Sequence, residues 1–204
     1  MELIPTQEEV VALLRETGAL RTGFFEYENG LYSNEHLQMA LAFRHHQNLK
    51  TLSVALSRLV RTNTELRAAI PNLSIVAPAP TGLPVAFGVC EALRARRVYW
   101  GERENANEPQ RFRQFLDQDL GEKVLLVDDL LRTGRKLGEL KALCEANGAE
   151  VLGLATVVYQ PNPDCADFKD LPFFYLAKLN STFKTAQDTW IDTKPGQEPV
   201  RIWG

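Results

Sequence analysis

One segment constrains this chain more than any other. Four consecutive apolar residues, 124–127, lead directly into two adjacent acids, Asp128 and Asp129. A short loop containing Thr133 and Gly134 follows, and a helical pattern begins soon after it. A short apolar run that ends at polar residues is typical of a strand buried inside a sheet. The segment therefore predicts a strand, a tight loop and a helix in immediate succession.

Strand and helix patterns alternate over much of the chain. The expected helices cover 7–17, which opens with the capping box Thr6 to Glu9, and then 35–44, 51–69, 84–93 and 137–146. The expected strands cover 74–77, 98–100, 123–127, 151–159 and 173–178. Such alternation predicts an α/β protein with a central parallel sheet and helices on both faces. Ligands of these sheets bind beyond the carboxyl ends of the strands.

The remaining segments lack a clear helical pattern. An aromatic stretch at 24–32 is punctuated by Asn29 and Gly30 and is expected to form short strands or loops. The polar segment 101–121 is expected to be a long loop, and 161–170 a turn-rich connection. At 204 residues the chain is long enough for one domain with a full core, and we expect a single domain over 1–204.

The composition excludes several classes of protein. Hydrophobic residues make up 45% and charged residues 24%, the proportions of a globular protein. The net charge of −3 argues against nucleic-acid or membrane-surface binding, and no apolar run approaches the roughly 20 residues of a membrane span. The three cysteines, Cys90, Cys144 and Cys165, are odd in number and widely spaced. We therefore expect a cytoplasmic protein without a disulfide framework.

The segment after the apolar strand has the chemistry of a sugar-phosphate site. A tight turn at Thr133 and Gly134 directs backbone N–H groups to one point, and the following helix directs its positive end there, which suits a phosphate. The carboxylates of Asp128 and Asp129 can accept hydrogen bonds from a vicinal diol. Together they describe a ribose 5-phosphate site. The GxxxxGK[ST] spacing of a Walker loop is absent.

This segment resembles the motif by which type I phosphoribosyltransferases bind phosphoribosyl pyrophosphate (PRPP). Of that family, the orotate phosphoribosyltransferases resemble the chain most, and the similarity covers nearly all of it. It extends over 14–20, 23–24, 33–38, 77–84, 101–104, 174–179 and 193–196. The resemblance implies a type I phosphoribosyltransferase fold, with a small hood built from about 1–35 and 165–204.

The resemblance also implies roles for particular residues. It places the acids Asp128 and Asp129 on the ribose hydroxyls and, with Arg103, makes them the catalytic residues. Arg111 and Arg113 lie further along the same loop. The residues expected to bind PRPP are Pro80, Thr81, Arg103, Asp128, Asp129, Leu130, Leu131, Arg132, Thr133, Gly134, Arg135 and Lys136.

Several positions depart from the family pattern. Ala106 stands near the position of a loop lysine, Glu28 replaces a lysine near the substrate loop, and Arg132 replaces the usual threonine of the phosphate loop. Gln160 stands where the family has an arginine that contacts the carboxylate of the base. We expect His36, Arg132 and Gln160 to contact the base, with Arg132 either restoring the lost charge or pointing at phosphate.

The family reaction joins a base nitrogen to C1 of ribose 5-phosphate and expels pyrophosphate. It implies Mg²⁺ held mainly by PRPP, and a homodimer whose mobile loop reaches the partner's site. His45 and His46 are adjacent rather than four residues apart, so we expect no metal site made by the protein alone. Three hypotheses remain: an orotate transferase in pyrimidine nucleotide synthesis, a transferase for another base, and a PRPP-binding regulator without catalysis.

Overall fold

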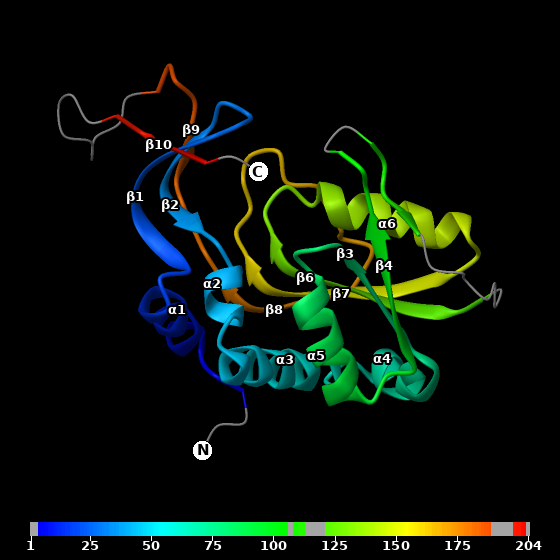
Figure 1. The fold of residues 1–204 in the computed structure, drawn as a ribbon. Helices are drawn as coiled ribbons and strands as arrows, with labels where there is room; N and C mark the ends of the chain where they lie inside the picture. Colours follow the sequence, from blue (N-terminus) through cyan, green and yellow to red (C-terminus); the bar gives the residue numbers. More distant parts are fainter. Residues whose placement is uncertain (1–3, 106–107, 113–120, 189–197, 203–204) are drawn as a thin grey trace.

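The computed structural model describes residues 4–105, 108–112, 121–188 and 198–202 of the chain. Within these residues the strands form two separate sheets, one of six strands and one of four. The six-stranded sheet lies at the centre of the molecule and the four-stranded sheet stands at one end of it (Figure 1).

The central sheet has the strand order β5-β4-β3-β6-β7-β8. All neighbouring strands pair in parallel except β4 and β5, which are antiparallel. The strands are β3 (Ser74–Pro78), β4 (Arg97–Glu102), β5 (Arg111–Phe112), β6 (Lys123–Leu131), β7 (Glu150–Tyr159) and β8 (Phe173–Lys178). Every residue of β3 is buried, as are eight of the ten residues of β7. Burial on both faces explains why these strands are nearly continuous apolar runs.

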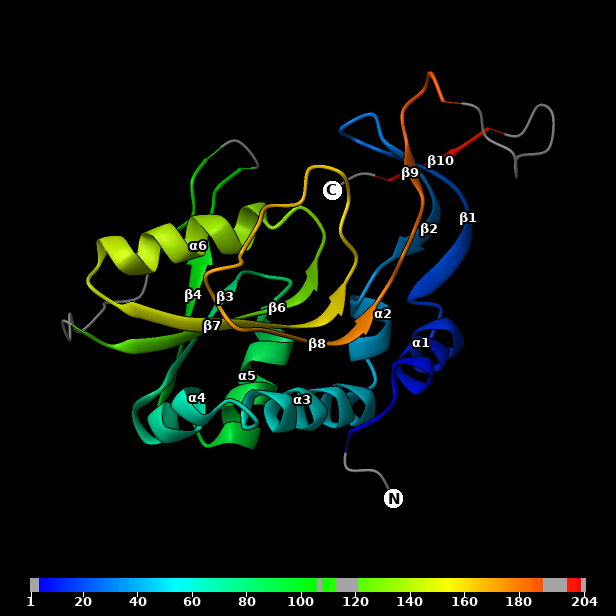
Figure 2. The same cartoon turned by 180° about the vertical axis from the view of Figure 1, so that it is seen from behind.

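Helices cover both faces of the central sheet, as the sequence predicted. On one face lies α6 (Arg135–Ala146), and on the other lie α3 (His46–Val60), α4 (Thr64–Ala69) and α5 (Leu83–Leu93) (Figures 1 and 2). A 3-10 turn, η1 (Ile70–Asn72), joins α4 to β3. The helix α1 (Gln7–Glu16) packs beside β8, and its N-terminus has the expected capping box between Thr6 and Glu9.

The four-stranded sheet is the hood implied by the family resemblance. It contains β1 (Leu20–Tyr27), β2 (Tyr32–Leu37), β9 (Phe183–Lys184) and β10 (Val200–Ile202) in the order β10-β1-β2-β9. Its strands therefore come from both ends of the chain. After β8 the chain crosses from the central sheet to β9, which Figure 2 shows from behind.

The helix predicted over 35–44 is wrong. Residues 32–37 form β2, and the helix α2 covers only Ala40–Phe43. The register of β2 on β1 pairs Leu37 with Leu20, and both side chains are buried. Pairing with β1 therefore overrides a local pattern that is compatible with a helix.

The single helix predicted over 51–69 is divided in two. The helix α3 ends at Val60, and α4 begins after Asn63, whose side-chain oxygen accepts a hydrogen bond of 3.0 Å from the N–H of Leu66. Asparagine is a favoured N-cap because its oxygen satisfies a free N–H of the first turn. The cap explains the break, which apolar periodicity alone does not show.

Two further boundaries differ from expectation. The strand expected to end at residue 127 continues as β6 to Leu131, because Leu130 pairs with Val158 of β7. The segment 101–121, expected to be a loop, contains the end of β4 and the short strand β5, which pair with each other. Ala106 and Arg113 lie outside the described residues.

Candidate active site

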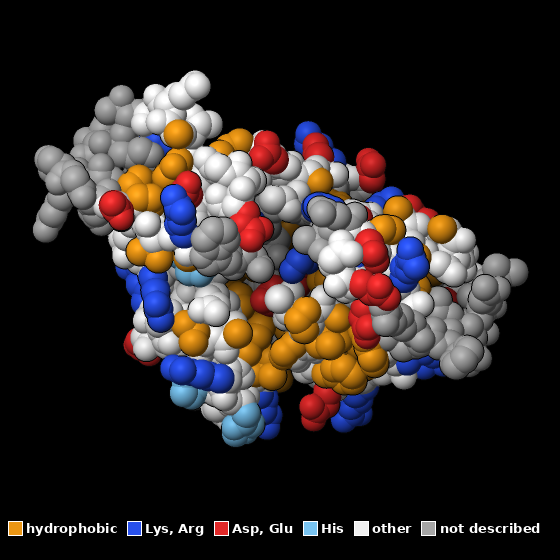
Figure 3. Space-filling model, turned by 45° about the horizontal axis from the view of Figure 1, so that its top comes forward, with side chains coloured by type: hydrophobic (Ala, Val, Ile, Leu, Met, Phe, Trp, Pro, Cys, Tyr) orange, Lys and Arg blue, Asp and Glu red, His pale blue; other side chains and the backbone are white. Residues whose placement is uncertain are grey.

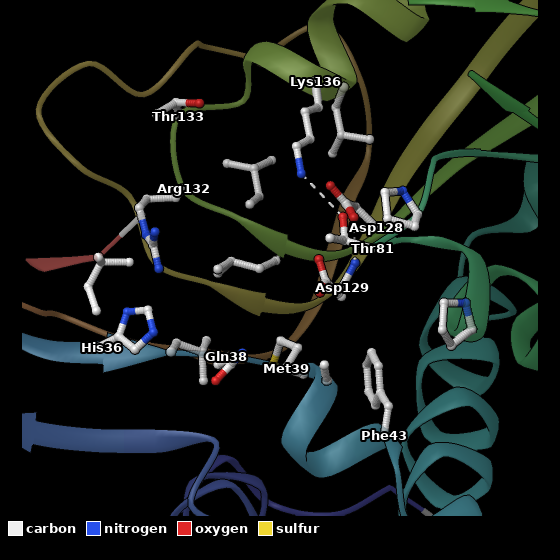
Figure 4. A pocket seen from close by; sticks show the side chains of 18 of the residues that line it. His36, Gln38, Met39, Phe43, Thr81, Asp128, Asp129, Arg132, Thr133 and Lys136 are labelled. Atoms are coloured by element: carbon white, nitrogen blue, oxygen red, sulfur yellow. Dashed lines mark hydrogen bonds between the residues drawn. The ribbon is translucent and has the colours of Figure 1, made fainter. Parts of the chain in front are cut away.

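Two loops meet at the carboxyl edge of the central sheet. The strands β3 and β6 are neighbours, so the loop after β3 (79–82) lies beside the loop after β6 (132–134). The Nζ atom of Lys136 donates a hydrogen bond of 3.2 Å to Oγ1 of Thr81 and joins the two sides (Figure 4). A cleft of about 800 Å³ opens over both loops and extends to the hood, and Figure 3 shows charged side chains inside a hollow on this face.

Most residues expected to bind PRPP line this cleft. Those that do are Pro80, Thr81, Asp128, Asp129, Leu130, Leu131, Arg132, Thr133, Gly134 and Lys136. The structure therefore brings together two segments that are about 50 residues apart in the sequence. Arg103 and Arg135 are not among the cleft-lining residues.

The two acids lie next to each other in the wall of the cleft. Asp128 is only 2% exposed, and its Oδ1 accepts a hydrogen bond of 2.8 Å from the backbone N–H of Asp129. Burial and, second, the carboxylate of Asp129 raise the pKa of Asp128 well above its usual range, against an opposing effect of Lys136. Burial also raises the pKa of Asp129. The free protein thus holds two carboxyl groups whose full ionisation is unfavourable without a ligand.

The phosphate loop is supported from behind by the segment 161–171. Gly134 has a φ of 72°, and a Cβ atom there would lie 2.8 Å from Cε2 of Phe168. The backbone N–H of Ala166 donates to the carbonyl of Thr133 at 2.8 Å, which holds the loop against that segment. Gly134 directly precedes α6, so the loop places the positive end of this helix at the cleft. Both the left-handed backbone and the close approach require glycine.

Gly82 supports the site from beside the cleft, and the sequence analysis gave it no role. A Cβ atom at this position would lie 3.0 Å from Oδ1 of Asp128 and 2.8 Å from Cδ of Pro78. Glycine therefore allows the 79–82 loop to approach the acid pair. The available signal was a glycine inside a proline-rich loop that follows a buried strand.

Arg132 points away from the phosphate loop. Its Nε and Nη2 donate hydrogen bonds of 3.1 and 3.0 Å to Oε1 of Gln160, and its guanidinium lies 4.7 Å from the ring centroid of Tyr27. Figure 4 shows Arg132 on the side of His36, whereas Lys136 lies on the side of the acids. Gln160 is fully buried and does not line the cleft itself. The three residues expected at the base are thus gathered in one place, with Gln160 behind Arg132.

His36 is neutral near pH 7. Burial, Arg132 and Arg21, in that order, lower its pKa from 6.5 to about 4. Its Nδ1 lies 3.4 Å from the hydroxyl of Tyr27. A neutral imidazole in the cleft can exchange hydrogen bonds with a base without adding charge.

The structure does not bring Arg103 to the acid pair. Its Nη2 forms an ion pair of 2.6 Å with Oε2 of Glu139 on α6, and Arg135 contacts the other oxygen of Glu139 at 2.9 Å. Gln110, which is buried, donates to the carbonyl of Lys136 at 2.8 Å. Both ends of the 103–110 segment, Arg103 and Gln110, therefore contact α6. The catalytic role of Arg103 stays a prediction.

The hood and the segment 38–43, which includes α2, contribute further cleft residues that the sequence analysis missed. They are Leu37, Gln38, Met39, Ala40, Phe43, Arg201 and Ile202. No signal identified them, because 35–44 was assigned to a helix and β10 was not predicted.

Among the described residues, no group of three or more His, Cys, Asp or Glu side chains is gathered as a metal cage. No helix in the described ranges is long and apolar enough to span a membrane.

The comparisons with known proteins agree with this geometry. The chain is 31% identical over 158 residues to the orotate phosphoribosyltransferase of Pelotomaculum thermopropionicum, with 77% of each chain covered. It is 33% identical over 174 residues to that of Acidithiobacillus ferrooxidans, with 85% of each chain covered. The crystal structure of orotate phosphoribosyltransferase from Aeropyrum pernix has the same fold, with a TM-score of 0.65 and 18% identity over 83% of this chain and 93% of that one. No protein-family model matches the chain.

The fold and the cleft define the class of protein. A mostly parallel sheet with a separate hood, and an acid pair between two loops at its carboxyl edge, is the architecture of a type I phosphoribosyltransferase. Identities above 30% over most of both chains are more specific. The chain belongs to the orotate phosphoribosyltransferase family.

Proposed function

We propose that the protein transfers ribose 5-phosphate from PRPP to orotate and releases pyrophosphate. The base nitrogen forms a bond to C1 of the ribose as the C1–O bond to pyrophosphate breaks, and the electron pair of that bond leaves with pyrophosphate. The observation that carries the proposal is the placement of Asp128 and Asp129 between the two loops, in a cleft whose hood end holds Arg132, a cation that forms no ion pair with any described residue. We also propose a role for each group that lines the cleft.

The loops and the acids divide PRPP between them. The backbone of 132–136 and the start of α6 receive the 5-phosphate, and the acid pair receives the ribose hydroxyls. Pro80 and Thr81 receive pyrophosphate, and Lys136 contributes its charge between the two phosphate groups. Burial disfavours the ionised form of both acids by raising their pKa values. Hydrogen bonds from the ribose hydroxyls of PRPP favour the ionised form and so offset this effect.

The donor set fits a magnesium ion bound mainly by the substrate. Mg²⁺ prefers oxygen ligands and usually takes one or two carboxylates together with phosphate oxygens. Asp128 and Asp129 offer carboxylate oxygens at the place where the ribose and pyrophosphate oxygens of PRPP would lie. When bound, the ion would neutralise charge on the leaving pyrophosphate.

The hood end of the cleft suits an anionic base. Among the described residues Arg132 forms no ion pair, although it is partly buried and burial lowers its pKa. A buried cation without an anion is costly, and a ligand carboxylate removes that cost. Orotate carries such a carboxylate, whereas the common nucleobases are neutral. We propose that Arg132 does the work of the arginine that the family has at the position of Gln160.

We further propose that the protein works as a homodimer in the cytoplasm. The resemblance implies that the loop carrying Arg103 acts in the partner's site, which is consistent with its absence from this chain's own cleft. Phe87 on α5 is 52% exposed beside Trp100, and Figure 3 shows hydrophobic side chains gathered next to the hollow. An apolar surface of this kind suits contact with a second subunit.

A PRPP-binding regulator is the second candidate. The ion pair of Arg103 with Glu139 favours it, since this arrangement holds the predicted catalytic arginine outside the cleft. A regulator would keep the acid pair and the phosphate loop and would lack turnover.

A panel of bases separates the candidates. The purified protein is incubated with PRPP, Mg²⁺ and either orotate, uracil, adenine, guanine or hypoxanthine, and pyrophosphate release is measured. We expect release with orotate alone. Pyrophosphate release with another base instead would show that this base, and not orotate, is the substrate. PRPP binding without pyrophosphate release for any base would favour the regulator.

A further inference from the structure

A chain of hydrogen bonds links Arg132 to the hood. Gln160 accepts from Arg132 through Oε1 and donates from Nε2 to Oγ of Ser181 at 2.7 Å. Ser181 in turn donates from Oγ to Oε2 of Glu35 at 2.7 Å. The other carboxylate oxygen of Glu35 faces Arg15 at 3.8 Å. We call Arg132, Gln160, Ser181 and Glu35 the relay.

Every donor of the relay points in the same direction. The chain begins at a cation, passes through a neutral amide and a hydroxyl, and ends at the carboxylate of Glu35. The amide of Gln160 is held in one orientation, because a flipped amide would turn its NH₂ group toward the guanidinium of Arg132 and its oxygen toward Ser181. Hydrogen bonds in such a chain polarise one another. The relay thus anchors Arg132 without placing an anion directly on it.

This arrangement leaves one edge of the guanidinium available. Nε and Nη2 of Arg132 both donate to the same oxygen of Gln160, and no described residue accepts a hydrogen bond from Nη1. The guanidinium lies over the ring of Tyr27, and the hydroxyl of Tyr27 donates a hydrogen bond of 3.2 Å to the carbonyl of Glu35. The end formed by Nη1 and Nη2 is the edge that grips a carboxylate with two parallel hydrogen bonds.

We infer that Ser181 and Glu35 are positioning residues for selectivity. They fix Gln160, and through it they aim the free edge of Arg132 at a carboxylate on the base. This inference rests on the proposed function and names the structural basis of its choice of base. Without a carboxylate in the cleft, the oriented cation stays unpaired, and a neutral base is rejected for that reason.

Two nucleotides that differ only in this carboxylate test the relay. Orotidine 5′-monophosphate and uridine 5′-monophosphate are titrated calorimetrically into the full-length protein, its Ser181→Ala and Glu35→Gln variants, and Ser181→Thr, which keeps the hydroxyl. Ser57→Ala is the matched control, because the hydroxyl of this buried serine donates to the carbonyl of Val54 within α3 and has no other partner in the described part of the chain. Thermal denaturation checks that each variant is folded.

We expect wild type to bind orotidine 5′-monophosphate more tightly than uridine 5′-monophosphate. Ser181→Ala should weaken the first about 5- to 50-fold, because it leaves Nε2 of the buried Gln160 without an acceptor. Glu35→Gln should weaken it less, because it removes the charge at the end of the relay but keeps an oxygen that accepts from Ser181. Both variants should change the second less than about twofold. Ser181→Thr should restore most of the preference, and Ser57→Ala should leave it unchanged.

Each contrary outcome has a distinct meaning. Equal binding of the two nucleotides by wild type would overturn carboxylate recognition and, with it, orotate as the proposed base. A wild-type preference that Ser181→Ala leaves intact would overturn the relay alone. Equal weakening of both nucleotides in a folded variant would also overturn it, since that result indicates a general loss of structure in the cleft.

Discussion

Replacing Asp128 by asparagine is expected to stabilise the ligand-free protein and to weaken PRPP binding. The carboxyl group is buried, and its neighbour Asp129 raises its pKa. Asparagine keeps an oxygen for the backbone N–H of Asp129 and can donate its NH₂ group to the carboxylate of that residue. The substitution therefore removes an unfavourable charge while the hydrogen bonds are kept.

The size of the effect follows from the charges around the site. Two like charges roughly 4 Å apart repel by about 4 kcal/mol at an effective dielectric constant of 20. Lys136 offsets part of this repulsion. We therefore expect the free energy of unfolding at pH 7 to rise by about 1–3 kcal/mol, which corresponds to a rise in Tm of roughly 2–12 °C for a domain of this size. Loss of a charge-assisted hydrogen bond to the ribose should weaken PRPP binding about 10- to 100-fold.

The pH dependence identifies the cause. A carboxyl group whose pKa is raised on folding destabilises the folded state above its unfolded pKa, and this cost is relieved as the pH falls toward about 4. The difference in Tm between Asp128→Asn and wild type should be largest above the pKa of Asp128 in the folded protein, and it should become smaller toward pH 4.

Differential scanning calorimetry from pH 4 to 8 measures this difference. Asp188→Asn is a control of opposite sign, because hydrogen bonds from Thr185 lower the pKa of that exposed carboxylate. A Tm of Asp128→Asn below wild type at pH 7, or a difference in Tm that does not change with pH, would refute the reasoning.

Three further predictions concern the cleft. Gly134→Ala should lower the free energy of unfolding by about 1–3 kcal/mol because of its positive φ and the contact with Phe168, whereas the helical Gly138→Ala, with open space around it, should raise it by up to about 1 kcal/mol; chemical denaturation tests both signs. Lys136→Gln should weaken PRPP binding about 10- to 100-fold in calorimetry, and unchanged affinity would remove it from the phosphate site. Because the pKa of His36 is lowered to about 4, wild type loses stability as the pH falls from about 6.5 to 4, and His36→Gln should lose about 1–2 kcal/mol less after allowance for partial exposure; equal losses in urea unfolding at pH 7 and 4.5 would contradict this.

The central sheet and its phosphate site were predictable because their signals are local. Apolar runs predicted β3, β7 and the first part of β6 close to their observed positions, since strands buried on both faces need apolar side chains throughout. The succession of strand, acid pair, glycine turn and helix determined the site around Asp128 and Gly134. Their closeness to Thr81 follows from parallel strands ending at one edge.

The hood was not predictable in detail because pairing partners decide it. Residues 35–37 have no local property that excludes a helix, and their strand forms only against β1. The segments that complete this sheet come from the far end of the chain, as β9 and β10 do. The cleft residues that the hood supplies were missed for the same reason.

The orientation of Arg132 also depended on distant residues. The sequence did not decide whether Arg132 contacts the phosphate or the base. Gln160 comes 28 positions later and Tyr27 more than 100 positions earlier, and both hold the guanidinium on the hood side. Only the tertiary structure brings these three side chains together.

Product analysis tests the central claim most directly. The protein is incubated with PRPP, orotate and Mg²⁺; orotate loss is followed by its ultraviolet absorbance, and phosphorus NMR and mass spectrometry identify the products. We expect orotidine 5′-monophosphate and pyrophosphate in equal amounts, and we expect the Asp129→Asn variant to form neither. Orotate that stays unconsumed while wild type binds PRPP, or turnover that Asp129→Asn leaves unchanged, would contradict it.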